Sequence, residues 1–221
     1  NGSPRKNGAT AKILKRMQEK LGEKEEVSIS YYNLEEFSLL ECRGCLTCYS
    51  KGICHLKDDM ESINQKVAES DALIIGSPVY VSNVPCTLKK YIDRGHFVLE
   101  QSLHGKYTFA VTTYEIGGSS DVISILNKLY RISGGISLGN LQIKLPFNSN
   151  PLELNGLESK LDKTADKIYN SIKHKKGKHW FDRLFNRIAI QNVIKPYVMT
   201  KPKQYKAIIE RWQKLRIMKE V

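Results

Sequence analysis

Four of the five cysteines in this chain fall within one short stretch, ECRGCLTCYSKGICHLKDDM at residues 41–60. Cys42, Cys45, Cys48 and Cys54 follow the spacing C-x2-C-x2-C-x5-C. Thiolates are soft ligands, so this set suits an iron–sulfur cluster or a zinc ion. A three-residue step that occurs twice wraps a cluster closely, which favours a cluster over zinc. A disulfide and a metal-free loop are the remaining alternatives.

The grouping of these cysteines also bears on the cell compartment. Secreted disulfide domains spread their cysteines along the chain, so we expect a protein of the reducing cytoplasm. Cys86 stands apart, and we expect it to be a small buried residue. No run of 18 or more apolar residues occurs, so the sequence predicts no membrane-spanning helix.

The formal net charge of +12 is concentrated near the C-terminus. Residues 1–172 contain 21 Lys+Arg and 20 Asp+Glu, whereas residues 173–221 contain 14 and 3. We therefore expect a main domain at 1–172 and a basic helical extension at 173–221. Nucleic-acid binding requires a recognition motif as well as positive charge, and the sequence contains none, so we expect no nucleic-acid partner.

The extension contains two apolar helical patterns. The first consists of Trp180, Phe181, Leu184, Phe185 and Ile188, and we expect it to pack on the main domain or on a second subunit. Binding to an anionic membrane surface is the less favoured alternative. The second pattern, which also predicts a helix that packs on a surface, consists of Tyr205, Ile208, Ile209 and Trp212.

Helical and strand-like patterns alternate along the main domain. The periodicity predicts helices at 10–21, 58–68, 85–94, 121–132 and 157–174, and strands at 26–32, 72–76, 106–113 and 136–147. This alternation predicts a doubly wound α/β fold, in which a parallel sheet lies between two layers of helices. The chain begins in a loop, so we expect the first strand of the sheet upstream of Asn1 or supplied in another way.

Ligands of such folds bind at the carboxyl ends of the strands, so the loops that follow strands are candidate sites. Residues 1–10 combine small residues, hydroxyl groups and two cations before a helix, which suits a phosphate, although an ordinary capped loop is equally compatible. Residues 76–85 contain two prolines and Tyr80, a surface suited to a planar heterocycle. Residues 112–119 contain a Gly-Gly pair that allows close approach of the backbone to a ligand.

Three motifs together resemble the flavodoxin-fold NAD(P)H-dependent FMN reductases, and more narrowly the iron–sulfur flavoproteins. They are GSPRKNGAT, the cysteine spacing followed by DDM, and GSPVYVSNVPCTLKKYIDR, and the resemblance extends over residues 1–145. It implies a flavodoxin-like fold that binds FMN, with a 4Fe–4S cluster beside the flavin. Similar cysteine loops also occur in relatives that are simple flavin enzymes, so a metal-free loop stays open.

The resemblance assigns site residues by position. Those implied to bind FMN are Ser3, Arg5, Asn7 and Thr10 at the phosphate, Pro78, Val79, Tyr80 and Asn83 at the ring, and Thr113 and Gly118 in the third loop. Those implied to hold a cluster are Cys42, Cys45, Cys48 and Cys54. The third loop departs from the Gly-rich pattern of the family, because Tyr114, Glu115 and Ile116 are bulky.

The implied function is an FMN-dependent oxidoreductase. Electrons would come from NAD(P)H or a protein donor and pass to a quinone, a flavin or another acceptor. A one-electron carrier with a 4Fe–4S cluster is the alternative, and a flavin-less scaffold tethered by the basic extension is a third hypothesis. Flavin chemistry requires no protein acid or base, so we expect no catalytic side chain. By resemblance we expect a homodimer or a higher homo-oligomer.

Overall fold

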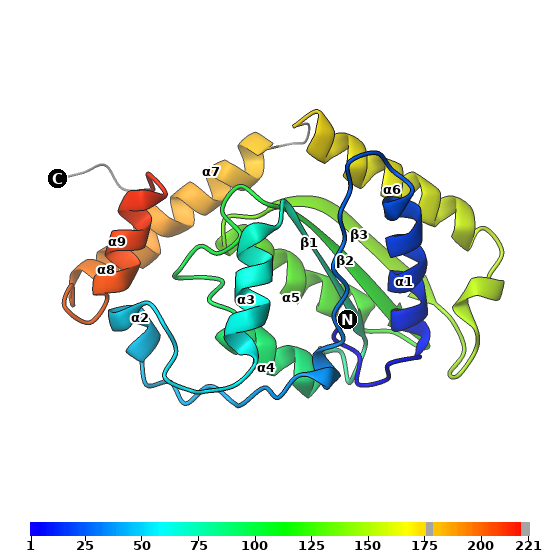
Figure 1. Ribbon diagram of the computed structural model, residues 1–221, viewed down its shortest axis with the longest axis horizontal. Helices are drawn as coiled ribbons and strands as arrows, with labels where there is room; N and C mark the ends of the chain where they lie inside the picture. Colours follow the sequence, from blue (N-terminus) through cyan, green and yellow to red (C-terminus); the bar gives the residue numbers. More distant parts are fainter. Residues whose placement is uncertain (176–178, 218–221) are drawn as a thin grey trace.

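A parallel sheet between two layers of helices forms the centre of the molecule (Figure 1). The computed structural model describes residues 1–175 and 179–217. Its strands lie in the order β1-β2-β3 and run parallel. They are β1 (Ala72–Pro78), β2 (Tyr107–Tyr114) and β3 (Ile136–Lys144). The strands expected in these three regions are confirmed.

The helices divide between the two faces of the sheet. On one face α1 (Ala9–Gly22) and α6 (Leu157–Lys173) bury Ile13, Leu14 and Leu161 against Phe109 of β2. On the other face, α4 (Cys86–Arg94) and α5 (Ser119–Ile132) bury Leu88 and Leu126 against Ile75 and Ala110, and α3 (Met60–Glu69) packs beside them. The described chain therefore has the expected doubly wound, three-layer α/β/α architecture.

Shorter elements connect these layers and form the C-terminal extension. They are η1 (Leu34–Glu36), α2 (Thr47–Lys51), η2 (Pro151–Glu153), α7 (His179–Ala189), the π-helix η3 (Ile190–Ile194), α8 (Lys195–Met199) and α9 (Lys206–Lys214). No helix in the described ranges combines the length and the apolar character that crossing a membrane requires.

The expected strand at 26–32 is wrong, because no strand is formed there. Its apolar residues Val27, Ile29 and Tyr31 pack against the α1–α6 side of the core. The amino group of Asn1 donates to the carbonyl of Tyr32 at 2.7 Å, and the Gly2 N–H donates to the carbonyl of Gly76 at 2.8 Å. Asn1 and Gly2 thus lie between this segment and the end of β1, which keeps the two from pairing. The strand expected upstream of Asn1 stays a prediction.

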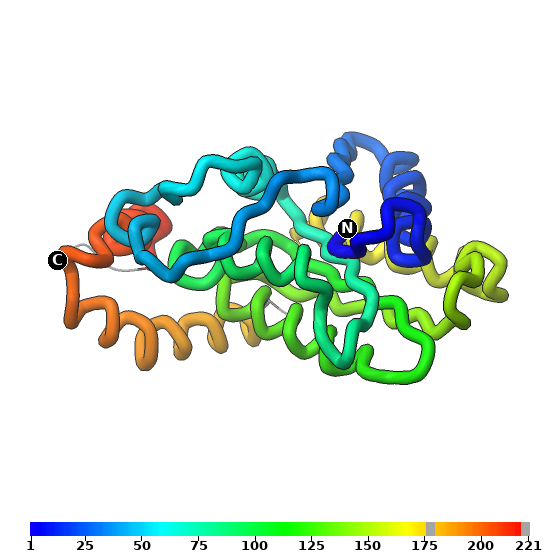
Figure 2. The backbone as a smooth tube through the Cα atoms, turned by 90° about the horizontal axis from the view of Figure 1, so that it is seen from below, coloured from blue at the N-terminus to red at the C-terminus, as the bar shows by residue number. Residues whose placement is uncertain are grey.

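The extension packs in two different ways as it runs along the side of the domain (Figures 1 and 2). Tyr205, Ile208 and Trp212 are buried, which confirms that the second apolar pattern packs on a surface of the protein. In α7, by contrast, Asp182 and Asn186 are buried and the apolar side is exposed. The expectation that the apolar side of α7 packs on the main domain is therefore wrong, and its packing on a second subunit stays a prediction. The physical reason for this orientation is that Asp182 and Asn186 form hydrogen bonds with the main domain.

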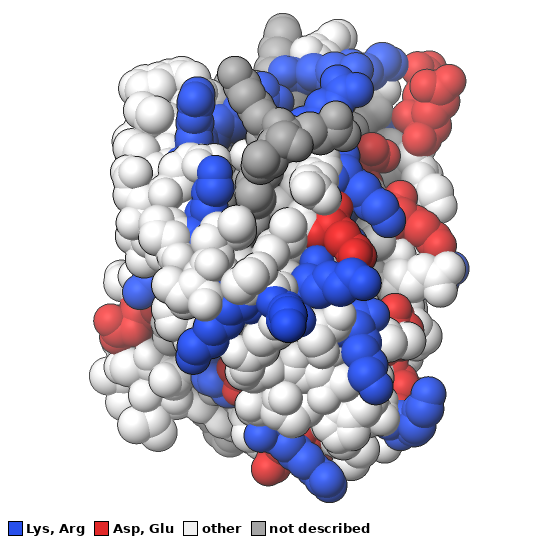
Figure 3. Space-filling view, turned by 90° about the vertical axis from the view of Figure 1, so that its left-hand side faces the viewer, with Lys and Arg blue, Asp and Glu red and all other residues white. Residues whose placement is uncertain are grey.

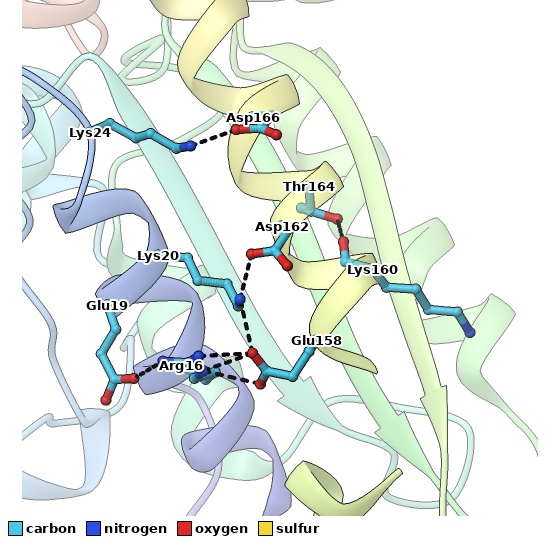
Figure 4. A network of polar contacts seen from close by, with 9 residues as sticks. All are labelled: Arg16, Glu19, Lys20, Lys24, Glu158, Lys160, Asp162, Thr164 and Asp166. Carbon is cyan, nitrogen blue, oxygen red and sulfur yellow. Dashed lines mark hydrogen bonds and ion pairs between the residues drawn. The ribbon is translucent and has the colours of Figure 1, made fainter. Parts of the chain in front are cut away.

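Ion pairs join α1 to α6 across the surface of the domain (Figure 4). Glu158 accepts from Arg16 at 2.8 Å and from Lys20 at 2.9 Å. Lys20 also pairs with Asp162, and Lys24 lies 2.6 Å from Asp166. The hydrogen bonds from Arg16, followed by those from Lys20, lower the pKa of Glu158 to about 2.

We predict a pH-dependent effect of Glu158→Gln. A carboxylate whose pKa is lowered in the folded state stabilises the fold fully above its unfolded-state pKa, near 4.5, and loses this effect as the pH falls toward 2. The substitution should lower the urea midpoint at pH 7, and the difference from wild type should shrink as the pH is lowered toward 3. Addition of about 1 M NaCl at pH 7 should also shrink it through screening. A difference that stays constant with pH would contradict the ion-pair explanation.

Candidate functional site

The three loops singled out from the sequence meet at the carboxyl ends of the strands. Besides the bond from Gly2 to Gly76, the Val79 N–H donates to the carbonyl of Thr113 at 3.0 Å. The hydroxyl groups of Thr10 and Thr113 lie 2.7 Å apart in a buried hydrogen bond. The first loop is thus joined to the second and third, as the sequence predicts.

The first loop leaves the N-terminus of α1 open to an anion. Ser3 and Thr10 are buried, and the Ser3 hydroxyl accepts from the Arg5 N–H at 3.1 Å. Arg5 and Asn7 are exposed. Helix α1 has no side-chain cap and no acidic residue in its first turn, so its first N–H groups are available to a ligand. Ser3 and Thr10 are therefore enclosed within the loop, whereas Arg5 and Asn7 are open to solvent or to a ligand.

A fourth loop, residues 145–150, joins this site and was missed from the sequence. The guanidinium of Arg5 donates to the Asn148 side chain at 2.8 Å and lies 5.2 Å from the centre of the Phe147 ring. Lys12 of α1 donates to Asn150 at 3.3 Å. This loop follows β3, so the rule that directs attention to the carboxyl ends of strands could have found it.

The second loop contains a tight turn against which the third loop packs. Tyr80 and Asn83 exchange two backbone hydrogen bonds of 2.9 Å, with Val81 at a φ of 49° and Ser82 at 56°. A β-branched residue is rare in this left-handed region, so the turn is strained at Val81. A Cβ on Gly118 would lie 2.8 Å from the Ser82 hydroxyl and 2.9 Å from a Val79 methyl group. Gly118 therefore allows the close packing that a side chain would prevent.

All four cysteines of the predicted set line one cavity of about 290 Å³. The cavity lies between the cysteine loop, the last turn of α4 and the segment 96–100. The four are free thiols; Cys42 and Cys45 are exposed, and Cys48 and Cys54 are half-buried. Cys86 is also free but exposed, so the expectation that it is buried is wrong.

The cavity and the three loops lie at opposite ends of α4. The second loop leads into the first residue of α4, whereas Ile92 and Arg94 at its other end line the cavity. Leu129, near the end of α5, lines the cavity too. A nine-residue helix is roughly 13 Å long at 1.5 Å per residue. We expected a cluster beside the flavin, and within one chain this expectation is wrong. The cysteine loop lies at the far end of α4 from the three loops that follow the strands.

One buried guanidinium holds the cysteine loop in place. Arg94 pairs with Asp58, and both side chains are only 2% exposed. Arg94 also donates to the carbonyl of Leu40 at 2.9 Å and to the sulfur of Cys54 at 3.5 Å. Asp58 accepts in turn from the Leu40 N–H at 2.8 Å. The two ends of the cysteine loop, at Leu40 and Asp58, are therefore fastened together at the end of α4.

The environment of these groups changes their proton affinities. Burial alone would raise the pKa of Asp58, but hydrogen bonds from Arg94 and from the Leu40 and Met60 amides lower it. Burial, followed by the nearby Glu100, raises the pKa of Cys48 to about 12. A hydrogen bond from Thr47 lowers the pKa of Cys45. Without a metal, the cavity therefore favours the neutral thiol of Cys48 over the thiolate. A bound metal centre would stabilise the thiolate instead.

A second donor set overlaps the four cysteines. The sulfur of Cys48, a ring nitrogen of His96 and a carboxylate oxygen of Glu100 all lie within 4.8 Å of one another. Cysteine, histidine and glutamate are ligands that zinc accepts. Because Cys48 belongs to both sets, zinc stays an alternative to a cluster of iron and sulfide.

The C-terminal extension covers the cysteine loop. The ring of Tyr205 stacks on that of Tyr49, with centres 5.6 Å apart, and Tyr49 follows Cys48 directly. The Trp212 indole N–H donates to the carbonyl of Leu99 at 2.7 Å. Figure 1 shows α9 beside α2. The sequence pattern predicted that these aromatic residues pack, but it contained no signal for the cysteine loop as their partner.

The family model described as NADPH-dependent FMN reductase matches residues 1–149. The chain belongs to this family. An iron–sulfur flavoprotein of Clostridioides difficile (strain 630) is 40% identical over 220 residues, which cover 99% of this chain and 97% of that protein. An iron–sulfur flavoprotein of Archaeoglobus fulgidus is 34% identical over 143 residues, which cover 62% of this chain and 63% of that protein.

Solved structures support the fold of this FMN reductase-like oxidoreductase. An FMN-dependent NADH-azoreductase from Bacillus anthracis, in complex with FMN, superposes with a TM-score of 0.56 at 16% identity and covers 75% of this chain and 94% of that chain. A flavodoxin from the domain Archaea gives a TM-score of 0.51 at 13% identity over 76% of this chain and 93% of that chain. The expected flavodoxin-like fold is thus confirmed.

We predict that Arg94→Met destabilises this FMN reductase-like protein by about 3–5 kcal/mol, because it leaves Asp58 buried and unpaired. Urea unfolding followed by circular dichroism measures the free energy of unfolding. The double variant Arg94→Met/Asp58→Asn should recover part of the loss. Arg16→Met, which removes a partly exposed ion pair, serves as the control and should cost less than about 1 kcal/mol. Equal effects of Arg94→Met and Arg16→Met would show that Arg94 does not fasten the loop.

Proposed function

We propose that the protein transfers electrons between FMN, bound at the carboxyl ends of the strands, and a 4Fe–4S cluster in the cysteine cavity. NAD(P)H or a protein is the proposed donor, and a quinone, a flavin or a protein the proposed acceptor. The observation that supports this most strongly is that all four spaced cysteines line one cavity. The name of the C. difficile relative, an iron–sulfur flavoprotein, agrees with it.

We assign the FMN phosphate to the first loop. The uncapped N-terminus of α1 offers N–H groups and the positive end of a helix dipole. Arg5 adds a positive charge that its neutral partner Asn148 does not neutralise. Asn7 is exposed beside it, and the buried hydroxyl groups of Ser3 and Thr10 keep the loop in shape.

We assign the isoalloxazine ring to the second and third loops. The residues proposed to contact it are Pro78, Val79, Tyr80, Asn83, Thr113 and Gly118. When bound, the flavin supplies hydride and electron transfer at its N5 and C4a edge. Pro78 and Val79 provide apolar surface that excludes water, and Gly118 lets the third loop close on the second. No side chain is assigned as a proton donor.

We assign the cluster to Cys42, Cys45, Cys48 and Cys54. Four soft donors around one cavity fit an iron–sulfur cluster, which supplies one-electron exchange when bound. Arg94 lines the cavity, and its Nε is buried with no hydrogen-bond partner among the described residues. This donor and the bond from Arg94 to Cys54 suit an anionic occupant of the cavity, because both offer N–H groups of a cation. Hydrogen bonds to the sulfurs of a cluster also raise its reduction potential.

A one-electron carrier that serves a partner enzyme is the second candidate. Its support is the exposure of Cys42 and Cys45 at the end of the molecule opposite the flavin loops. A protein partner could reach a cluster there without access to FMN. Fast oxidation of NAD(P)H with a quinone would favour the reductase, whereas a reducible cluster with negligible NAD(P)H oxidation would favour the carrier.

We also infer a homo-oligomer. Exposed apolar side chains surround the proposed flavin site on the loops after all three strands. They are Tyr80, Val81, Ile116 and Phe147. Apolar groups around a ligand site suit a protein contact, and a second copy of this chain is the proposed partner. Sedimentation equilibrium measures the mass that decides this.

We predict that Arg5→Gln weakens FMN binding about tenfold or more, because a charge-assisted hydrogen bond to phosphate is lost. Binding of riboflavin, which lacks the phosphate, should change little. Fluorescence titration of apoprotein with each flavin measures both affinities. Lys128→Gln, which changes an exposed cation in the middle of α5, is the matched control and should alter neither. Equal weakening for FMN and riboflavin would place the phosphate elsewhere.

We predict that Cys48→Ser abolishes the paramagnetic signal of a reduced cluster in anaerobically purified protein. Serine is a hard ligand and removes one of the four thiolates. Cys86→Ser, which alters an exposed cysteine outside the cavity, should retain the full signal. FMN absorbance should persist in both variants, which separates the two centres. Equal signals from the two variants would rule out Cys48 as a ligand.

A further inference from the structure

Helix α7 carries its apolar side outward, away from the protein. Five large residues form an apolar stripe along it, and all are at least 41% exposed. They are Trp180, Phe181, Leu184, Phe185 and Ile188. Val193, Tyr197 and Met199, which follow α7 in the chain, are exposed as well. Several large apolar side chains exposed along one side of a helix mark an interaction site.

Polar contacts fix this orientation. On the opposite side of α7, Asp182 accepts from Arg131 at 3.0 Å and from the Ser137 N–H at 3.1 Å. The Asn186 amide donates to Gln101 at 2.9 Å and to the carbonyl of Ile132 at 3.0 Å. Turning the helix to bury the apolar stripe would break these bonds and leave buried polar groups unpaired, which is costly. The apolar stripe therefore stays outward in the folded protein.

Positive charge surrounds the apolar stripe. Residues 179–217 contain nine Lys or Arg and two Asp or Glu, and both acids are already paired, Asp182 with Arg131 and Glu210 with Lys206. Arg183 and Arg187 are exposed and lie on α7 itself. Figure 3 shows Lys and Arg side chains spread among uncharged surface over the end of the molecule that the extension forms. The surface that covers the apolar stripe must therefore tolerate or attract cations.

We propose that the apolar stripe docks α7 on an anionic lipid surface. A helix with Trp, Phe and Leu on one side and cations beside them lies in the plane of a membrane, with its apolar side among the acyl chains. Arg183 and Arg187 then face acidic headgroups, where each cation adds to the attraction. A second copy of the chain would bring two strongly basic surfaces together, so charge complementarity favours the lipid over a dimer.

Vesicle co-sedimentation of the full chain tests this proposal. We expect binding to vesicles of equimolar phosphatidylcholine and phosphatidylglycerol, weaker binding to phosphatidylcholine alone, and loss of the difference at high salt. Phe181→Ser/Phe185→Ser should weaken binding roughly tenfold or more, because two aromatic side chains no longer insert. Arg183→Gln/Arg187→Gln should weaken binding to the mixed vesicles roughly fivefold or more and leave binding to phosphatidylcholine unchanged.

Leu152→Ser is the matched control, because Leu152 is 40% exposed in η2, outside the extension, and should leave binding unchanged. Far-ultraviolet circular dichroism checks that each variant is folded. Failure of the wild type to bind the mixed vesicles would overturn the proposal. So would equal binding of wild type and Phe181→Ser/Phe185→Ser. If sedimentation equilibrium shows that this double variant instead lowers the mass of an oligomer, the apolar stripe is a contact between copies and the proposal is wrong.

Discussion

The buried pair of Arg94 and Asp58 is the interaction on which the arrangement of the candidate cluster site depends. A guanidinium that is 2% exposed is stable only when its charge and most of its donors are satisfied. Asp58 and the carbonyl of Leu40, at the two ends of the cysteine loop, accept hydrogen bonds from Arg94. The loop between them contains little regular structure beyond the five-residue helix α2. Its cysteines therefore line one cavity because both ends of the loop are held at the last turn of α4.

The direction of α4 and α5 places the two candidate sites at opposite ends of the molecule. Helices that connect parallel strands run back against them, so each begins near the proposed flavin loops and ends near the opposite edge of the sheet. The cysteine cavity, the segment 96–100 and the C-terminal extension all gather at that opposite edge. Trp212 and Tyr205 close over this region, which gives the extension a structural role at the cysteine loop. Electron transfer within one chain would have to pass along the length of α4.

Local patterns predicted most of the fold and the loops that form the proposed flavin site. Periodicity identified β1, β2, β3 and the helices around them, and the parallel arrangement then placed the loops around Thr10, Val79 and Thr113 at one edge. Residues 26–32 alternate like a strand, but within the described residues no strand pairs with them, and a strand needs a partner that its own sequence does not specify. The loop at Asn148 was missed because its role depends on contact with Arg5, a residue distant in sequence.

The sequence also could not show which side of α7 faces the protein. An amphipathic pattern identifies two sides of a helix, and the apolar side is usually buried. Here the contacts of Asp182 and Asn186 with buried backbone groups decide the opposite orientation, and these contacts are visible only in three dimensions. The sequence likewise did not show that the cysteines lie far from the proposed flavin loops. Two loops can be near each other in the sequence and still lie at different edges of the sheet.

The most direct test of the two-centre proposal is the measured content of FMN, iron, sulfide and zinc in wild-type protein purified without oxygen and reconstituted with iron and sulfide. An ultraviolet–visible spectrum recorded on the same sample reports flavin and cluster together. The proposal predicts about one FMN and about four iron atoms with matching sulfide per chain, and little zinc. FMN accompanied by zinc at Cys48, or by no metal at all, would contradict it.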